Sequence, residues 1–151
     1  MSDRFSFMST YAHSLDDKGR MALPGKLRDE LQKSEHPDEM VAFPSEEGFI
    51  TLYPHEHWQK VEADLRSIED TDQRDAALEY YMGLSDRITL DKSGRLLIPP
   101  RHREIAGLER EVEVIGKLFK IVIRPRRQSD DQAAQARPQA PDPSVVKKIF
   151  L

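Results

Sequence analysis

The stretch LDDKGRMALPGKLRDEL, residues 15–31, has a second copy in LDKSGRLLIPPRHREIA, residues 90–106. Both copies contain an Asp, a Gly three residues later, an Arg directly after it and a Pro four residues further on. An ordered set of matches at one constant offset is hard to produce by chance, so the two stretches predict an internal duplication. The matched pairs are Leu15/Leu90, Asp16/Asp91, Gly19/Gly94, Arg20/Arg95, Leu23/Ile98, Pro24/Pro99 and Arg28/Arg103.

The duplication continues downstream of these copies. MVAFPSEEGFITLYP (40–54) matches EVEVIGKLFKIVIRP (111–125) in its apolar positions and in its final Pro. The second unit reaches this stretch four residues sooner than the first and is therefore four residues shorter. Each copy therefore belongs to a repeated unit of about 45 residues.

Each unit is predicted to consist of a β-hairpin, a short helix and a second β-hairpin. The Asp side chain of Asp-x-x-Gly can accept bonds from backbone N–H groups just ahead of it, and the Gly supplies a positive φ. Leu23 and Ile98 are expected to point inward from the returning strands. Pro24 and Pro99 are expected to open the short helices and Gly107 to end the second one. The second hairpins are predicted at 40–43 with 49–53 and at 111–115 with 118–124.

A unit this small has too few apolar residues to fold alone, because 38% of the chain is hydrophobic and 33% is charged. Two copies can interlock their strands, share one core and cover sheet edges that would otherwise be open. We therefore expect a mostly β protein with short helices, in which the two units form one body.

The segment between the units has helical periodicity. In PHEHWQKVEADLRSI, residues 54–68, the residues Trp58, Val61, Leu65 and Ile68 recur at helical spacing, a stripe that favours a core or a subunit contact. TDQRDAALEYYMG, residues 71–83, predicts a second helix, with Thr71 as its N-cap and Gly83 as its end. The predicted divisions are unit 1 at 7–54, a helical hairpin at 55–83, unit 2 at 84–127 and a disordered, Pro/Ala-rich tail at 128–151.

Composition argues against several classes of protein. The chain has no cysteine, which excludes disulfides, a thiolate nucleophile and a Cys-based zinc site, and it has no apolar run as long as a membrane span. His55 and His57 diverge on a helix, and no further ligand stands at metal spacing. We therefore expect no catalytic residues, no metal and no cofactor, and a soluble, cytoplasmic protein. The net charge of −4 does not exclude nucleic-acid binding, which depends on a local basic face.

Arg20 and Arg95 are the strongest candidates for a functional site. Each follows a turn Gly at the tip of a rigid hairpin, and an Arg fork suits guanine O6/N7 or phosphate. The structural alternative is that each Arg pairs with Asp16 or Asp91 and merely holds its turn. The repetition favours DNA binding, because holding a turn does not require Arg. The supporting candidates are Lys18 and Lys92 in the turns and Arg28 and Arg103 at equivalent positions of the short helices.

Three stretches resemble the MraZ family of bacterial transcriptional regulators: FMSTYAHSLDDKGRMALPGKLRDEL, LYPHEHWQKVEADL and ITLDKSGRLLIPPRHREIAGLEREVEVIG. The similarity runs from about Phe7 to Arg127. One departure is Ser9, where the family usually has Gly. The tail from Gln128 onward, which ends in SVVKKIFL, lies outside the resemblance.

The resemblance implies tandem AbrB-like units with swapped hairpins, which form a barrel as a pseudo-dimer and assemble into a ring homo-oligomer. It also implies a cytoplasmic, nucleoid-associated repressor of the protein's own cell-division and cell-wall operon. Such a protein binds short direct repeats in promoter DNA through its Asp-x-x-Gly-Arg loops. In this sequence those loops are Asp16–Arg20 and Asp91–Arg95, with Gly19 and Gly94 as the turn glycines. The alternative is an AbrB-like oligomeric module of antitoxin type that acts through protein contacts.

Overall fold

The computed structural model describes residues 4–126, 139 and 141–146. The described residues form eight strands in two antiparallel sheets with short helices, which confirms the predicted mostly β fold class. In the first unit the elements are β1 (Thr10–Ser14), β2 (Arg20–Ala22), α1 (Gly25–Leu31), β3 (Glu39–Ser45) and β4 (Phe49–Pro54). Between the units lie α2 (His55–Arg66), α3 (Thr71–Ala77) and the π-helix η2 (Leu78–Met82). The second unit contains β5 (Asp86–Thr89), β6 (Arg95–Leu97), α4 (Pro100–Ala106), β7 (Glu111–Lys117) and β8 (Lys120–Pro125).

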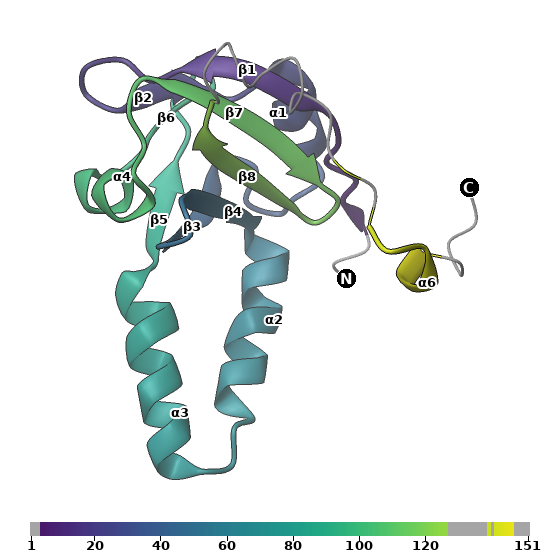
Figure 1. Ribbon diagram of the computed structural model, residues 1–151, viewed down its shortest axis with the longest axis vertical. Coiled ribbons are helices and arrows are strands. Elements are labelled where there is room, and N and C mark those ends of the chain that lie inside the picture. The colour runs from purple at the N-terminus through teal and green to yellow at the C-terminus, as the bar shows by residue number, and fades with distance from the viewer. Residues whose placement is uncertain (1–3, 127–138, 140, 147–151) are drawn as a thin grey trace.

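The two units exchange strands. The large sheet has the order β1-β7-β8-β4-β3-β5, so β1 of the first unit pairs with β7 of the second and β5 of the second pairs with β3 of the first. In Figure 1 the purple β1 accordingly lies along the green β7. The strands β2 and β6 form a separate two-stranded sheet, one strand from each unit. No closed hydrogen-bonded barrel forms among the described strands.

The first hairpin of each unit differs from its expected form. The turn at Asp16–Arg20 closes, with the Asp16 N–H donating to the Arg20 carbonyl at 2.9 Å, but β1 and β2 then enter different sheets. The second unit repeats this pattern with β5 and β6. The physical reason is that, when the units exchange strands, every strand pairs with a strand of the other unit and the two units share one core. The second hairpins, β3–β4 and β7–β8, form as predicted.

Both units contribute to one hydrophobic core. Leu23 and Ile98 are 4% and 0% exposed, which confirms that both point inward. Phe5 and Phe7 of the N-terminal segment are also buried and stack on each other at 5.5 Å between ring centroids. The other buried members include Leu27, Leu31, Ile50 and Leu52 from the first unit and Leu96, Val112, Ile121 and Ile123 from the second.

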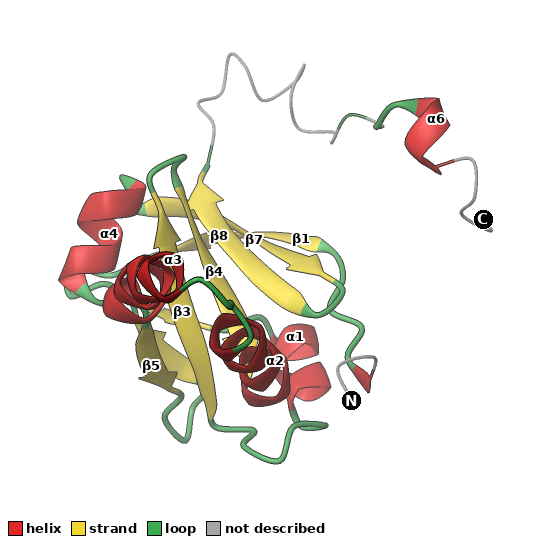
Figure 2. Ribbon diagram, turned by 90° about the horizontal axis from the view of Figure 1, so that it is seen from below, coloured by secondary structure: helices red, strands yellow, loops and turns green. Residues whose placement is uncertain are grey.

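The helical hairpin projects from the large sheet (Figure 1), and Figure 2 shows α2 and α3 end-on in front of it. Of the predicted stripe, Trp58 and Leu65 are buried, whereas Val61 and Ile68 are half-buried. Two details of the second helix are wrong in the prediction. Asp70, not Thr71, is the N-cap, because its side chain accepts the Gln73 N–H at 2.9 Å. Gly83 does not end the helix, because its backbone is right-handed helical and the helix continues to Leu84.

The short helices α1 and α4 each begin one residue later than expected. Pro24 and Pro99 are N-caps with extended ψ values of 136° and 143°, and helical geometry starts at Gly25 and Pro100. Gly107 ends α4 with φ 67°, as predicted. The predicted disordered tail, residues 128–151, lies largely outside the described residues. Its described part is residue 139 and residues 141–146, which include α6 (Pro143–Val146).

Candidate nucleic-acid interface

The turn at Asp16–Arg20 is built by local hydrogen bonds. Asp16 Oδ1 accepts the backbone N–H groups of Lys18 and Arg20, both at 2.9 Å, and the Gly19 N–H donates to the Asp16 carbonyl at 2.9 Å. Gly19 has φ +84°, a left-handed conformation that favours glycine. The predicted Asp-x-x-Gly turn chemistry is therefore confirmed at this loop.

The loop at Asp91–Arg95 has the same construction. Asp91 Oδ1 accepts the N–H groups of Ser93 and Arg95, both at 2.9 Å, and Gly94 has φ +77°. The two loops therefore present Arg20 and Arg95 at equivalent places, each as the first residue of a strand of the small sheet.

The small sheet is a two-stranded ribbon with one buried and one exposed face. Met21 and Leu96, which are opposite each other, are buried, and the residues on either side of them are exposed. Arg20 lies opposite Leu97 and Ala22 opposite Arg95, so the two arginines are diagonal neighbours on the exposed face. Diagonal neighbours in an antiparallel pair are roughly 7–8 Å apart.

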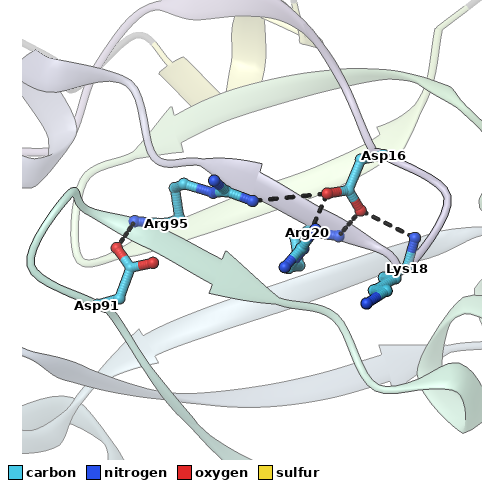
Figure 3. Close-up of polar contacts among 5 residues, drawn as sticks. All are labelled: Asp16, Lys18, Arg20, Asp91 and Arg95. Carbon is cyan, nitrogen blue, oxygen red and sulfur yellow. Dashed lines mark hydrogen bonds and ion pairs between the residues drawn. The ribbon is translucent and has the colours of Figure 1, made fainter.

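The Asp16 carboxylate forms ion pairs with both arginines of this face. Arg20 Nε lies 2.8 Å and an Arg95 terminal nitrogen lies 3.6 Å from Asp16 Oδ2 (Figure 3). Both arginines thus pair with Asp16, which agrees with the structural alternative, although only Arg20 pairs with the Asp of its own turn. Because the Arg20 and Arg95 side chains are 44% and 43% exposed, both guanidinium groups remain accessible.

The loop carboxylates are strongly stabilised as anions. Hydrogen bonding from the Arg20 backbone N–H is the leading cause that lowers the pKa of Asp16 from 3.8 to about 2. The corresponding bond from the Arg95 N–H lowers the pKa of Asp91 below 3.8. Both groups are therefore ionised at neutral pH.

The ribbon lies beside an open depression of about 310 Å³. Its lining contains three arginines, namely Arg20, Arg95 and Arg110, and one carboxylate, that of Asp16. The remaining lining residues are Ser14, Leu15, Met21 and Ala22.

The other predicted site residues fall into two groups. Lys18 and Lys92 are exposed in the turns, beside the arginines that they were expected to support. Arg28 and Arg103 are half-buried, and each lies over the turn glycine of the opposite unit. Arg28 and Arg103 occupy matched positions in the repeat, and each makes the matching contact with the other unit.

Two residues of this surface were missed by reasoning from the sequence. Leu97 is 47% exposed on the ribbon face, and only its alternation with the buried Leu96 could have indicated this. Arg110 is brought to the depression because its carbonyl accepts the Leu15 N–H at 2.7 Å. Arg110 has no partner in the repeat, so no sequence signal marked it.

Among the described residues, no group of three or more His, Asp or Glu side chains could hold a metal ion. Within the same residues, no helix is both long and apolar enough to cross a membrane.

The fold and the site define a class of mostly β protein in which two strand-exchanging units present an arginine-bearing two-stranded ribbon. The comparison with protein families matches residues 6–79 and 83–143 to the family described as "MraZ protein, putative antitoxin-like". The chain belongs to the MraZ family.

Relatives in three genera support this membership, and each is named "Transcriptional regulator MraZ". The relative from Syntrophomonas wolfei is 38% identical over 112 residues, which are 73% of this chain and 74% of the relative. Those from Pseudomonas putida F1 and Shewanella oneidensis are 35% and 32% identical over 115 residues, 76% of each chain. These relatives are named as regulators and not as enzymes.

Proposed function

We propose that this protein is a DNA-binding transcriptional regulator whose β2–β6 ribbon contacts double-stranded DNA. The observation that carries the proposal is the placement of Arg20 and Arg95, from two units, on one exposed ribbon face beside a single carboxylate. The major groove of B-DNA admits a two-stranded ribbon, and Arg donates two hydrogen bonds to guanine O6 and N7. The names of the relatives support the same function.

The geometry suits contacts to separated base pairs. A diagonal spacing of roughly 7–8 Å is close to two base-pair steps of about 3.4 Å each. Lys18 and Lys92 are exposed in the two turns, where we expect them to contact phosphates, and the exposed Leu97 offers an apolar surface to thymine methyl groups. Arg20 and Arg95 thus select bases, while the lysines position the duplex.

Affinity must come from repetition, because the whole chain carries a net charge of −4. We propose that the protein forms a ring homo-oligomer and binds short direct repeats, so that each engaged subunit raises the effective concentration of the next. The family resemblance supports repression of its own cell-division and cell-wall operon, and hence a place in the cytoplasm at the nucleoid.

The test is fluorescence anisotropy on duplex DNA from upstream of the protein's own gene. We expect Arg20→Ala with Arg95→Ala to weaken binding about 100-fold or more, since each bidentate arginine contributes about 1–3 kcal/mol of base discrimination. The matched control is Lys60→Ala with Arg66→Ala, which removes the same charge from α2, an element that projects away from the ribbon (Figure 1). Undiminished affinity in a folded Arg20/Arg95 variant would contradict the proposal.

A second candidate function is an antitoxin-type module that binds a protein. Three consecutive large side chains of η2, those of Tyr80, Tyr81 and Met82, are 39–48% exposed, which favours a protein contact there. The family description names the same type of activity. This alternative predicts little DNA affinity and a protein that co-purifies with the wild-type chain but not with a Tyr81→Ser/Met82→Ser variant.

A further inference from the structure

Arg28 and Arg103 make the same contact in opposite directions between the units. Arg28 extends from α1 over Gly94 of the second unit, and Arg103 extends from α4 over Gly19 of the first. A Cβ on Gly19 would lie 2.5 Å from Arg103 Nε, and one on Gly94 would lie 2.7 Å from Arg28 Cδ. Each guanidinium group therefore occupies the space above a glycine that has no side chain.

Hydrogen bonds hold both arginines in these positions. An Arg28 terminal nitrogen donates to the Lys92 carbonyl at 3.0 Å, inside the loop that carries Arg95. Arg103 Nε donates to the Ile98 carbonyl at 3.2 Å, and the Ile98 N–H in turn donates to the Gly19 carbonyl at 2.9 Å. The equivalent bond in the other direction, from the Leu23 N–H to the Gly94 carbonyl, is also 2.9 Å.

These contacts explain why the two glycines are buried although their loops project from the molecule. Gly19 and Gly94 are buried, whereas Lys18, Arg20, Lys92 and Arg95 beside them are exposed. The loops contain their own turn bonds, but the side that faces the protein is covered by an arginine from the other unit. The direction in which Arg20 and Arg95 leave the ribbon thus depends on that arginine.

We propose that Arg28 and Arg103 are positioning residues: Arg103 sets the loop that presents Arg20, and Arg28 sets the loop that presents Arg95. The inference rests on the proposed DNA-binding function for its consequence, and on the contacts between the units for its mechanism. It assigns these two arginines a role other than direct DNA contact. Each unit then determines how the other unit engages DNA.

The proposal requires arginine and not merely a positive charge. A guanidinium group is planar and can lie flat against a glycine peptide while its N–H groups donate sideways to carbonyls. The ammonium group of lysine has neither the plane nor the fork. Arg→Lys therefore separates positioning from electrostatic attraction at both sites.

The first test needs no DNA and uses amide hydrogen exchange on the full chain. We expect Arg103→Lys to speed exchange about 5–10-fold at Gly19 and Arg20 but not at Gly94 and Arg95, and Arg28→Lys to do the reverse. The matched control is Arg101→Lys, a neighbour on α4 whose side chain pairs with Asp86 instead of a loop. If either lysine variant unfolds, the glutamine variant, which keeps a planar N–H donor, replaces it. The proposal is overturned if exchange becomes faster in the loop of the same unit as the substituted arginine, or if it becomes faster in neither loop.

The second test compares DNA from upstream of the protein's own gene with random-sequence DNA of equal length. Arg28→Lys and Arg103→Lys should weaken binding to the upstream DNA about tenfold, while binding to random DNA stays within twofold because the charge is retained. If both variants bind both DNAs as tightly as the wild type does, Arg28 and Arg103 do not position the loops for DNA binding, and the proposal is overturned. If the wild type binds no DNA but the crossed exchange pattern is present, the mechanism stands and the proposed function fails.

Discussion

At the scale of single residues, the Asp16 carboxylate combines two tasks. Oδ1 accepts two backbone N–H groups of its own turn, and Oδ2 lies beside the guanidinium groups of Arg20 and Arg95. Asp91 carries out the first task at its own loop, with Oδ1 accepting the Ser93 and Arg95 N–H groups. The two loops are therefore alike in their backbone but differ in the balance of charge.

This difference predicts effects of unequal size in two matched variants. Asp16→Asn keeps an oxygen for the turn but removes the negative charge between the arginines, so affinity for random-sequence DNA at low salt should rise about two- to fivefold, as expected for exposed ion pairs. Asp91→Asn is the control and should change that affinity less. Anisotropy titrations measure both, and equal effects of the two variants would show that Asp16 does not restrain the arginines.

The lowered pKa of Asp16 predicts how its loop responds to acid. Because the folded pKa of about 2 lies below the ordinary 3.8, ionised Asp16 stabilises the fold above pH 4, and this contribution is lost as the pH falls toward 2. No change from this group is expected between pH 5 and pH 8. An NMR titration of the Asp16 carboxyl carbon should have its midpoint near 2; a midpoint near 3.8 would mean that the turn bonds are weak in solution.

At the scale of elements, the segment before β1 lies antiparallel beside the end of β7 and approaches it at very close range. Ser9 has φ 81°, a conformation that disfavours residues with a side chain. The Gly116 N–H donates to the Ser9 carbonyl at 2.8 Å, and a Cβ on Gly116 would lie 2.3 Å from the Met8 backbone nitrogen. This close approach thus requires glycine at position 116 and favours it at position 9.

Ser9→Gly is accordingly expected to raise the free energy of unfolding by about 0.5–1 kcal/mol, because it relieves the left-handed strain. Gly116→Ala should lower it by about 1–3 kcal/mol, since the backbone must move to admit the methyl group. Gly83→Ala, in a right-handed helical position with open space around the added Cβ, is the control and should be neutral or stabilising. Urea unfolding measures the free energy of unfolding of all three variants. An unchanged value for Gly116→Ala would contradict the close approach of the two segments.

At the scale of the whole molecule, strand exchange makes one cooperative body of the two units. The residues Leu27 and Ile98 belong to different units but to the same core, and each is at most 1% exposed. Loss of packing in one unit must therefore destabilise the other.

Leu27→Ala and Ile98→Ala are each expected to lower the free energy of unfolding by about 2–5 kcal/mol while unfolding remains a single transition. The fluorescence of Trp58, the one tryptophan of the chain, and far-UV circular dichroism should give the same midpoint in each variant. Two separate transitions, with only one unit affected, would show that the units do not share a core.

Much of the molecule follows from local sequence. The turns at Asp16 and Asp91 involve bonds between residues at most four apart, and the buried positions of Leu23 and Ile98 follow from alternation along short strands. The errors at Thr71 and Gly83 are of one or two residues, because neighbouring side chains compete for the same cap and a helix can continue through a glycine. The repeat also identified Arg20 and Arg95 as the central candidates.

The duplication and the arginine of each loop can be read directly from the sequence, and the two turns follow from it because their bonds join near neighbours. Three features required the folded structure: the pairing of β1 with β7 and of β3 with β5, the position of Arg95 beside Asp16, and the cover of the opposite glycines by Arg28 and Arg103. Each of these contacts joins residues far apart in the chain. Their geometry is set by the packing of the shared core, which is a property of the whole molecule and of no single stretch.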